Sequence, residues 1–229
     1  MKIFADGADI ESMRHALDTY KVDGFTTNPS LMVKAGVEDY FDFAQRAVSE
    51  FNPLPISFEV FADEFDEMYE QAMKLSGLSG NVYVKVPVTN TKGISSCELL
   101  RSLSGDGVKV NVTAVFTLEQ VKDVYEAIDH NTPSVVSIFA GRIADTLIDP
   151  EPIIQHAAQI CKATNCEVLW ASARELINIY HAYRNGCDII TLSHNILQKL
   201  DLKDKDLQEY SLETVKMFFQ DALSVGYSL

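Results

Sequence analysis

The sequence predicts a TIM barrel, a closed ring of eight parallel strands each followed by a helix. Short β-branched or apolar runs alternate eight times with segments of helical periodicity, at about 29 residues per unit. Several of these runs are apolar on both faces, which is typical of parallel strands that are buried on both sides. An open doubly wound sheet has the same alternation and is the alternative fold.

The alternation defines each expected element in order. Strands are expected at residues 2–5, 24–27, 56–60, 82–88, 109–115, 134–139, 167–171 and 189–192. Helices are expected at residues 11–20, 37–50, 64–78, 94–103, 118–128, 152–163, 174–185 and 196–200. Helix ends support these bounds, since Thr117 and Gln120 have capping-box spacing, Pro152 falls in a first turn, and Gly186 follows a helix.

A ninth amphipathic segment, residues 211–225, follows the eighth unit. It either packs on its own barrel or forms an arm that packs on a neighbouring subunit. Because the chain has no Gly/Ser-rich or Pro-rich linker, we expect residues 1–229 to form one domain that carries this C-terminal helical arm.

The charge balance excludes several classes of partner. The chain has 19 Lys and Arg against 33 Asp and Glu, a net charge of −14, which disfavours nucleic acid and anionic membranes.

It contains neither an apolar run long enough to span a bilayer nor a signal peptide, so we expect a cytoplasmic protein. The four cysteines and five histidines lack metal-ligand spacing, and we therefore expect reduced thiols and no metal site.

Lys85 is the most informative single residue, because it interrupts a run of valines (Val82, Val84, Val86 and Val88). Strand alternation puts Lys85 on the face opposite the valines, so it points into the barrel if the valines pack on helices. Burial lowers a lysine pKa and yields the neutral amine that Schiff-base chemistry requires. A lysine at the rim with an exposed ammonium is the alternative.

Two carboxylates end other strands, where a TIM barrel carries its chemistry. Asp6 ends the first strand and Glu59 the third, so both could meet Lys85 at the barrel mouth. Two carboxylates near one amine allow one to transfer protons and the other to activate water. The alternative for each is an ion pair with a neighbouring strand.

Two arginines follow the sixth and seventh strands. Arg142 and Arg174, beside Ser172, form a candidate anion clamp, because guanidinium groups bind phosphate-like oxygens through a planar set of donors. A surface salt bridge is the alternative for each of them. The chain lacks GxGxxG and P-loop motifs, so nucleotide binding through such loops is not predicted.

Seven segments, distributed nearly end to end, resemble the small transaldolases, the group that also contains fructose-6-phosphate aldolase. They are FADGADIE, VDGFTTNPSLM, FEV, VYVKVPVT, VNVTAVF, SIFAGRIAD and ASARE, of which TTNPSL and VKVPVT in this order are the most specific. The resemblance implies a TIM barrel, a Schiff-base lysine on the fourth strand, sugar-phosphate substrates and no cofactor or metal. It also implies a homo-oligomer, commonly a decamer assembled through the C-terminal arm.

The resemblance assigns roles residue by residue. Lys85 would form the imine at C2 of the ketose, and Asp6 would handle the proton of the C4 hydroxyl. Glu59 and Thr113 would hold a catalytic water. Substrate contacts would be Asn28, Asn111 and Ser137 for the dihydroxyacetone unit and Arg142, Ser172 and Arg174 for the phosphate of the acceptor.

Two positions separate the activities within this group. Transaldolases typically have Glu on the third strand and Phe on the sixth, and this chain has Glu59 and Phe139. The resemblance therefore favours transfer of dihydroxyacetone from a ketose phosphate, such as fructose 6-phosphate, to an aldose phosphate, such as erythrose 4-phosphate. Its alternatives are aldol cleavage that releases dihydroxyacetone and transfer between sulfonated or otherwise modified sugars. A catalytically silent barrel is a rival of another class, but it predicts an incomplete set of polar strand ends.

The chain departs from the group's pattern beside the expected site. Gly7 stands where Thr is usual after the catalytic Asp, Ile138 where Pro is usual after Ser137, and Ala173 where an aromatic often follows Ser172. These departures flank the expected anion pocket, and for this reason the choice of donor and acceptor stays open.

Overall fold

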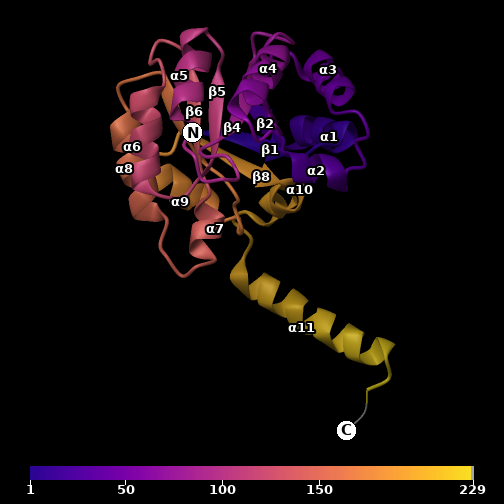
Figure 1. Cartoon of the computed structure of the whole chain (residues 1–229). Coiled ribbons are helices and arrows are strands. Elements are labelled where there is room, and N and C mark those ends of the chain that lie inside the picture. The colour runs from indigo at the N-terminus through magenta and orange to yellow at the C-terminus, as the bar shows by residue number, and fades with distance from the viewer. Residues whose placement is uncertain (228–229) are drawn as a thin grey trace. The chain divides into compact units, whose positions relative to one another are not determined.

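Eight parallel strands close into a barrel in sequential order, with β8 hydrogen-bonded to β1 (Figure 1). The computed structural model describes residues 1–227, and the chain divides into two compact units, Met1–Leu197 and Gln198–Leu229. The strands are β1 (Lys2–Asp6), β2 (Gly24–Thr26), β3 (Ile56–Glu59), β4 (Val82–Pro87), β5 (Val110–Val115), β6 (Ser134–Ile138), β7 (Cys166–Trp170) and β8 (Ile189–Ser193). The predicted TIM barrel is confirmed, and the open sheet is excluded.

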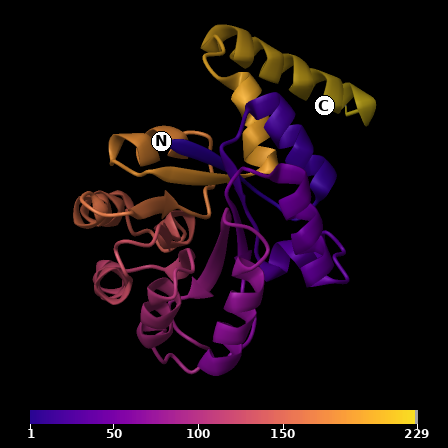
Figure 2. The same ribbon diagram turned by 90° about the horizontal axis from the view of Figure 1, so that it is seen from above.

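Helices follow the strands and surround them when the barrel is viewed from above (Figure 2). They are α1 (Ile10–Tyr20), α2 (Pro29–Lys34), α3 (Tyr40–Phe51), α4 (Phe65–Ser76), α5 (Cys97–Gly105), α6 (Leu118–Ala127), α7 (Ala140–Ala144), α8 (Glu151–Cys161), α9 (Asn178–Arg184) and α10 (His194–Leu197). Within residues 1–227, no helix has the length and apolar character needed to cross a membrane.

The core lies on both faces of the strands, as the doubly apolar runs predict. Val84 and Val86 on one face of β4 are fully buried. Side chains from other strands fill the barrel as one apolar cluster, against which Tyr83 and Phe139 pack: Phe4, Val135, Leu169, Ala171 and Ile189. Leu169 and Ala171 of this cluster also line a cavity at the carboxyl ends of the strands.

The expected helix ends are confirmed. Thr117 and Gln120 form a complete capping box at the start of α6. Pro152 lies in the first turn of α8. Gly186 follows α9 with a φ of 77°, a left-handed conformation that glycine adopts without strain.

Two short helices near the barrel mouth were not expected from the sequence. The side chain of Asn28 caps α2 by accepting a hydrogen bond from the Leu31 amide (3.0 Å), and Pro29 begins the helix. With six and five residues, α2 and α7 are too short to show helical periodicity. The helix expected at residues 174–185 begins later, at Asn178, whose side-chain oxygen accepts hydrogen bonds from the Arg174 and Glu175 amides.

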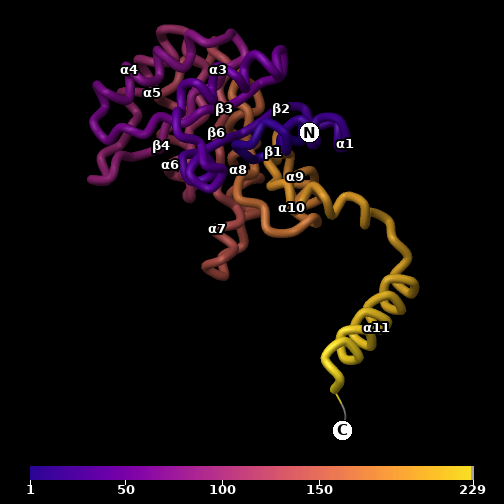
Figure 3. The backbone as a smooth tube through the Cα atoms, turned by 90° about the vertical axis from the view of Figure 1, so that its right-hand side faces the viewer, coloured from indigo at the N-terminus to yellow at the C-terminus, as the bar shows by residue number. Residues whose placement is uncertain are grey.

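The second unit contains a 3-10 helix, η1 (Gln198–Leu202), and a long helix, α11 (Leu207–Ser224), traced in Figure 3. The additional C-terminal helix is thus confirmed. Asp206 caps α11 by accepting hydrogen bonds from the Gln208 and Glu209 amides. Large apolar side chains of this helix are exposed: Leu207, Tyr210, Leu212, Val215, Met217, Phe218, Phe219 and Leu223.

Candidate active site

Lys85 points into the mouth of the barrel. Its side chain is 8% exposed and lines a cavity of about 160 Å³ formed by residues from seven strand ends and α7. The Lys85 ammonium donates a hydrogen bond to the Thr27 carbonyl (2.7 Å) and lies 3.1 Å from a carboxylate oxygen of Glu59. The rim position with an exposed ammonium is therefore excluded.

Glu59 is held at the end of β3 by a residue that the sequence analysis missed. The hydroxyl of the half-buried Tyr40, the first residue of α3, donates to the Glu59 carbonyl and accepts from the Glu59 amide, both at 2.8 Å. Burial raises the pKa of Tyr40, so this hydroxyl keeps its proton. Tyr40 and Glu59 are 19 residues apart, and no local pattern could have linked them.

Asp6 ends β1 beside the same cavity. The Thr26 hydroxyl donates to the Asp6 carboxylate (2.8 Å) and lies 2.5 Å from the Thr191 hydroxyl of β8. Burial raises the pKa of Asp6, although the nearby Lys85 charge and the Thr26 hydrogen bond lower it in part. An aspartate with a raised pKa can accept and return a proton, as a general base must.

Thr113 contributes a buried hydroxyl that has no hydrogen-bond partner among residues 1–227. The next residue, Ala114, has a φ of 58°, and the register of β5 with β6 shifts at this point. A bulge of this kind redirects a side chain at the end of a strand. The orphaned hydroxyl lines the Lys85 cavity and is available to a water or a substrate.

Asn111 and Ser137 form a buried polar row across the barrel. The Ser137 hydroxyl donates to the Asn111 side-chain oxygen (2.6 Å), and the Asn111 amide donates to the Ser57 hydroxyl (3.1 Å). Ser137 also lines the cavity, as does Asn28, whose oxygen caps α2. Satisfied rows of this kind fix the orientation of polar side chains inside a barrel.

The part of the cavity wall that follows β6 and β7 contains an aromatic ring, a guanidinium group and a strained stretch of backbone. The Arg142 guanidinium lies 5.7 Å from the centre of the Phe139 ring and makes no ion pair with any residue in 1–227. Ser172 has a φ of 62°, which is rare for a residue with a side chain. A Cβ atom at Gly141 would lie 1.6 Å from the Ser172 carbonyl oxygen, so only glycine permits this approach.

Arg174 is not brought together with the other expected site residues. Its guanidinium binds Asp145 (2.5 Å), and it lines a separate cavity beside Trp170 and His181. The Asn178 side chain binds the Arg174 amide, and the bent segment before α9 follows from this contact. In the structure described, Arg142 and Ser172 therefore line the same cavity, and Arg174 forms the salt bridge given above as its alternative.

The remaining site residues that the sequence analysis missed are threonines. Thr26, Thr27 and Thr191 are all buried, and each contacts Asp6, Lys85 or their neighbours. A signal was present, because each threonine interrupts or ends an apolar strand as Lys85 does. In residues 1–227 no group of three or more His, Cys, Asp or Glu side chains has a geometry suited to a metal ion.

A TIM barrel with ionisable and polar side chains gathered at the carboxyl ends of its strands is the architecture of a barrel enzyme. The particular family follows from comparison with known proteins. Residues 3–228 match the family described as Transaldolase/Fructose-6-phosphate aldolase, and the chain belongs to this family. It is thus a transaldolase-family enzyme, in agreement with the resemblance noted from its sequence.

Individual relatives agree with the family assignment. A protein of Desulforapulum autotrophicum named "Probable transaldolase" is 30% identical over 94% of this chain and 98% of its own length. Proteins with the same name from Herpetosiphon aurantiacus (34% identical, 93% of this chain and 94% of theirs) and Myxococcus xanthus (33%, 87% and 86%) are similarly close.

A solved structure supports the fold alone. A cube-shaped protein cage designed by fusing symmetric oligomeric domains aligns with 99% of this chain and 80% of its own chain, at a TM-score of 0.60 and 12% identity.

Proposed function

We propose that the protein is a Schiff-base transaldolase that transfers a dihydroxyacetone unit from a ketose phosphate to an aldose phosphate. One observation carries the proposal: a buried lysine amine lies 3.1 Å from the Glu59 carboxylate, in a cavity that Asp6 also lines. An amine between two carboxylates of different environment is suited to imine formation followed by proton transfer at a neighbouring carbon.

Imine formation begins with transfer of a proton from Lys85 to Glu59, after which the amine attacks C2 of the ketose. The resulting carbinolamine loses its hydroxyl as water, with Glu59 returning the proton. The unpartnered Thr113 hydroxyl, buried in the same cavity, is a suitable partner for this water. We therefore assign Glu59 and Thr113 to the water that leaves and later returns.

Carbon–carbon cleavage then depends on Asp6. The protonated imine draws electrons from the C3–C4 bond while Asp6 takes the proton of the C4 hydroxyl, so that the aldose leaves as an aldehyde and an enamine remains on Lys85. The raised pKa of Asp6 favours this proton uptake. Addition of the enamine to the acceptor aldehyde reverses the step, and Asp6 returns the proton to the new hydroxyl.

Substrate contacts follow from the side chains around the cavity. We propose that Asn28 and Ser137, which line the cavity, and Asn111, which accepts a hydrogen bond from Ser137, bind hydroxyls of the dihydroxyacetone unit, and that Arg142 and Ser172 bind the phosphate. Arg174 would have to exchange Asp145 for the phosphate in order to take part. Phe139 lacks a hydroxyl that could protonate the enamine, which favours transfer over release of dihydroxyacetone.

Reduction with borohydride in the presence of fructose 6-phosphate tests the lysine assignment. We expect a mass increment on the peptide that contains Lys85, and a modification at any other lysine of an active enzyme would contradict the assignment.

Incubation with fructose 6-phosphate alone tests transfer against release. Sustained formation of dihydroxyacetone without an acceptor would favour the aldolase, and a screen that includes sulfonated ketoses tests the donor class.

A homo-oligomer assembled through α11 completes the proposal. The exposed apolar side chains of this helix, among them Phe218 (62% exposed) and Phe219 (60%), would be costly to leave in water. Amphipathic helices with such a surface are commonly covered by another copy of the same chain. The family resemblance supports this role.

A further inference from the structure

Asp6 is held through one of its two carboxylate oxygens. Its Oδ1 accepts a hydrogen bond from the Thr26 hydroxyl (2.8 Å), and the Asp6 side chain forms no other hydrogen bond within residues 1–227. A carboxylate can exchange its two oxygens by rotation about its terminal torsion, which has a broad and roughly two-fold profile. The bond from Thr26 opposes this rotation, and it leaves Oδ2 for the proton of a substrate hydroxyl.

Thr191 supplies the next group in this arrangement. The strand that carries Asp6, β1, lies between β2, which carries Thr26, and β8, which carries Thr191. Both threonines are buried, and their hydroxyl oxygens lie 2.5 Å apart. The two strands that flank β1 thus each direct a hydroxyl into the barrel, and the two hydroxyls are in contact beside the Asp6 carboxylate.

The chemistry of a hydroxyl determines the direction of these bonds. A threonine hydroxyl has one proton and can donate only once, whereas an ionised carboxylate can only accept. Because the Thr26 proton is donated to Asp6, the Thr26 oxygen must accept the proton of Thr191. The Thr191 hydroxyl forms no other hydrogen bond in the part of the chain that the structure describes. The chain therefore runs from Thr191 through Thr26 to Asp6.

A chain with this direction strengthens its last bond. A hydroxyl whose oxygen accepts a proton becomes a better donor, because successive hydrogen bonds polarise one another. The bond from Thr26 stabilises the ionised form of Asp6 and lowers its pKa, whereas burial raises that pKa. Thr191 can thus act on Asp6 although the two side chains share no hydrogen bond.

We propose that Thr191 is a positioning residue of the transfer reaction, which acts through Thr26 to hold Oδ1 of Asp6 and keep Oδ2 directed to the substrate. The proposal rests on the transaldolase function. In the cleavage step the O–H bond at C4 breaks, its proton moves to Oδ2, and its electron pair forms the carbonyl of the leaving aldehyde. The electron pair of the C3–C4 bond moves into the enamine on Lys85. Addition of the acceptor reverses both transfers, and Oδ1 keeps its bond to Thr26 throughout.

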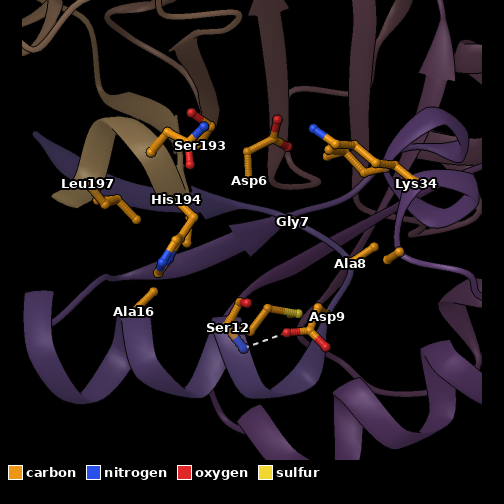
Figure 4. A pocket seen from close by; sticks show the side chains of 15 residues that line it. Asp6, Gly7, Ala8, Asp9, Ser12, Ala16, Lys34, Ser193, His194 and Leu197 are labelled. Atoms are coloured by element: carbon orange, nitrogen blue, oxygen red, sulfur yellow. Dashed lines mark hydrogen bonds between the residues drawn. The ribbon is translucent and has the colours of Figure 1, made fainter. Parts of the chain in front are cut away.

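The charges around Asp6 do not change when the Thr191 hydroxyl is removed. Asp6 lines the Lys85 cavity and also a second cavity of about 210 Å³, which lies between the ends of β1 and β8 and the helices α1, α2 and α10 (Figure 4). The charged and titratable side chains around Asp6 are Glu59, Lys85 and Arg142 on the side of the first cavity and Asp9, Lys34 and His194 on the side of the second. A Thr191→Val variant keeps all six, so a change at Asp6 is attributable to the hydroxyl.

Infrared difference spectra across a pH titration test the proposal at Asp6 itself. The band of its protonated carboxyl is assigned by its loss in Asp6→Asn. Thr191→Val, which replaces the hydroxyl by a methyl group of similar size, should raise the midpoint of this band by about 0.5 pH unit. Thr191→Ser keeps the hydroxyl and should stay within about 0.2 unit of wild type.

Thr132→Val is the matched control for this substitution. The Thr132 hydroxyl donates to the Ser104 carbonyl (2.8 Å), and Thr132 lines neither cavity. Its loss should leave the Asp6 midpoint unchanged. If Thr191 contributed only packing, valine would be the better replacement and serine the worse one, which is the opposite of the expected order.

A double substitution shows whether Thr191 acts through Thr26. Thr26→Val alone should raise the midpoint by about 1 pH unit, and adding Thr191→Val should raise it no further. The same further shift in this background as in wild type would overturn the proposal. An unchanged midpoint in Thr191→Val, or a serine variant that behaves like valine, would also overturn it.

The transfer assay separates this proposal from the proposed function. The acidic limb of the pH profile of kcat/KM should move with the infrared midpoint in each variant. A limb that stays in place while the midpoint moves would refute the role of Thr191 in the reaction. If the midpoint shifts as expected but wild type shows neither transfer nor a reducible imine, the transaldolase function fails, whereas the coupling of Thr191 to Asp6 is supported.

Discussion

At the scale of single residues, function depends on charges held where water is largely excluded. Lys85 is buried between a carbonyl and a carboxylate, and Asp6 is ionised only against the cost of burial. Burial of such charged groups lowers the stability of the fold but supplies reactive groups to the site. The loss of stability can be measured at Asp6.

Asp6→Asn should abolish transfer and stabilise the protein at neutral pH. Because burial raises the pKa of Asp6 in the folded state, the folded state binds a proton that the unfolded state has released, and stability falls as pH rises from the ordinary aspartate value of 3.8 through the raised one. The midpoint of thermal unfolding should therefore be higher for Asp6→Asn at pH 7, with the difference vanishing below about pH 3.8. A variant that is less stable than wild type at pH 7 would contradict the desolvation argument.

Gly141 is a second residue at which one added carbon atom should change the stability of the protein. Gly141→Ala should reduce the free energy of unfolding by about 2 kcal/mol or more, because its Cβ would lie 1.6 Å from the Ser172 carbonyl oxygen. Gly105→Ala in α5 is the control, where a Cβ meets nothing within 4 Å and the change should stay within about 1 kcal/mol. Urea unfolding of both variants checks the prediction, and equal stabilities would refute it.

At the scale of elements, helices that precede or follow a strand fix the residues at its end. The helix α3 carries Tyr40. The hydroxyl of Tyr40 forms hydrogen bonds with the Glu59 amide and carbonyl of the kind that a neighbouring strand would form. The helix α2 is capped by Asn28, and α7 begins against the strained backbone of Ser172. The position of Glu59 therefore depends on a side chain from a helix as well as on the barrel.

Tyr40→Phe tests this dependence. Loss of the hydroxyl leaves the Glu59 amide and carbonyl without their partner, and we expect kcat to fall about tenfold or more with little change in KM. Imine formation, followed by borohydride trapping over time, should slow by the same factor. Tyr69→Phe is the matched control, because its hydroxyl binds Asp106 in an exposed contact on α4 and its loss should leave kcat within about twofold.

At the scale of the whole molecule, two units have different surfaces. The barrel unit buries most of its apolar side chains, whereas α11 exposes them along most of its length. The proposed contact with another copy of the chain would cover this surface.

The pair of substitutions Val215→Glu and Phe219→Glu should lower the oligomeric state to that of a single chain. The two residues are one helical turn apart on α11, 61% and 60% exposed, so charges there interrupt an apolar stripe without affecting the barrel. Light scattering after gel filtration measures the mass, and circular dichroism checks that the barrel stays folded. An unchanged mass would show that α11 is not the assembly surface.

Much of this architecture could be predicted from local patterns. Lys85 could be predicted as a site residue because a charged side chain in a strand of valines has few favourable environments. The capping box at Thr117 could be predicted because its two partners are three residues apart. The ion pair of Arg174 with Asp145 and the contact of Tyr40 with Glu59 could not be predicted from local patterns, because the partners lie 29 and 19 residues apart in the chain. Contacts over such separations leave no periodic signal.

Local patterns of residues predicted the barrel, the lysine on β4 and the carboxylates on β1 and β3, because alternation and burial follow from backbone periodicity. Which charges stay unpaired near the strand ends depends on the folded chain. Arg142 makes no ion pair with any residue in 1–227, and Arg174 is bound to Asp145. The physical reason is that a charge's partner is set by distance in space, which the closure of the barrel defines and the order of residues does not.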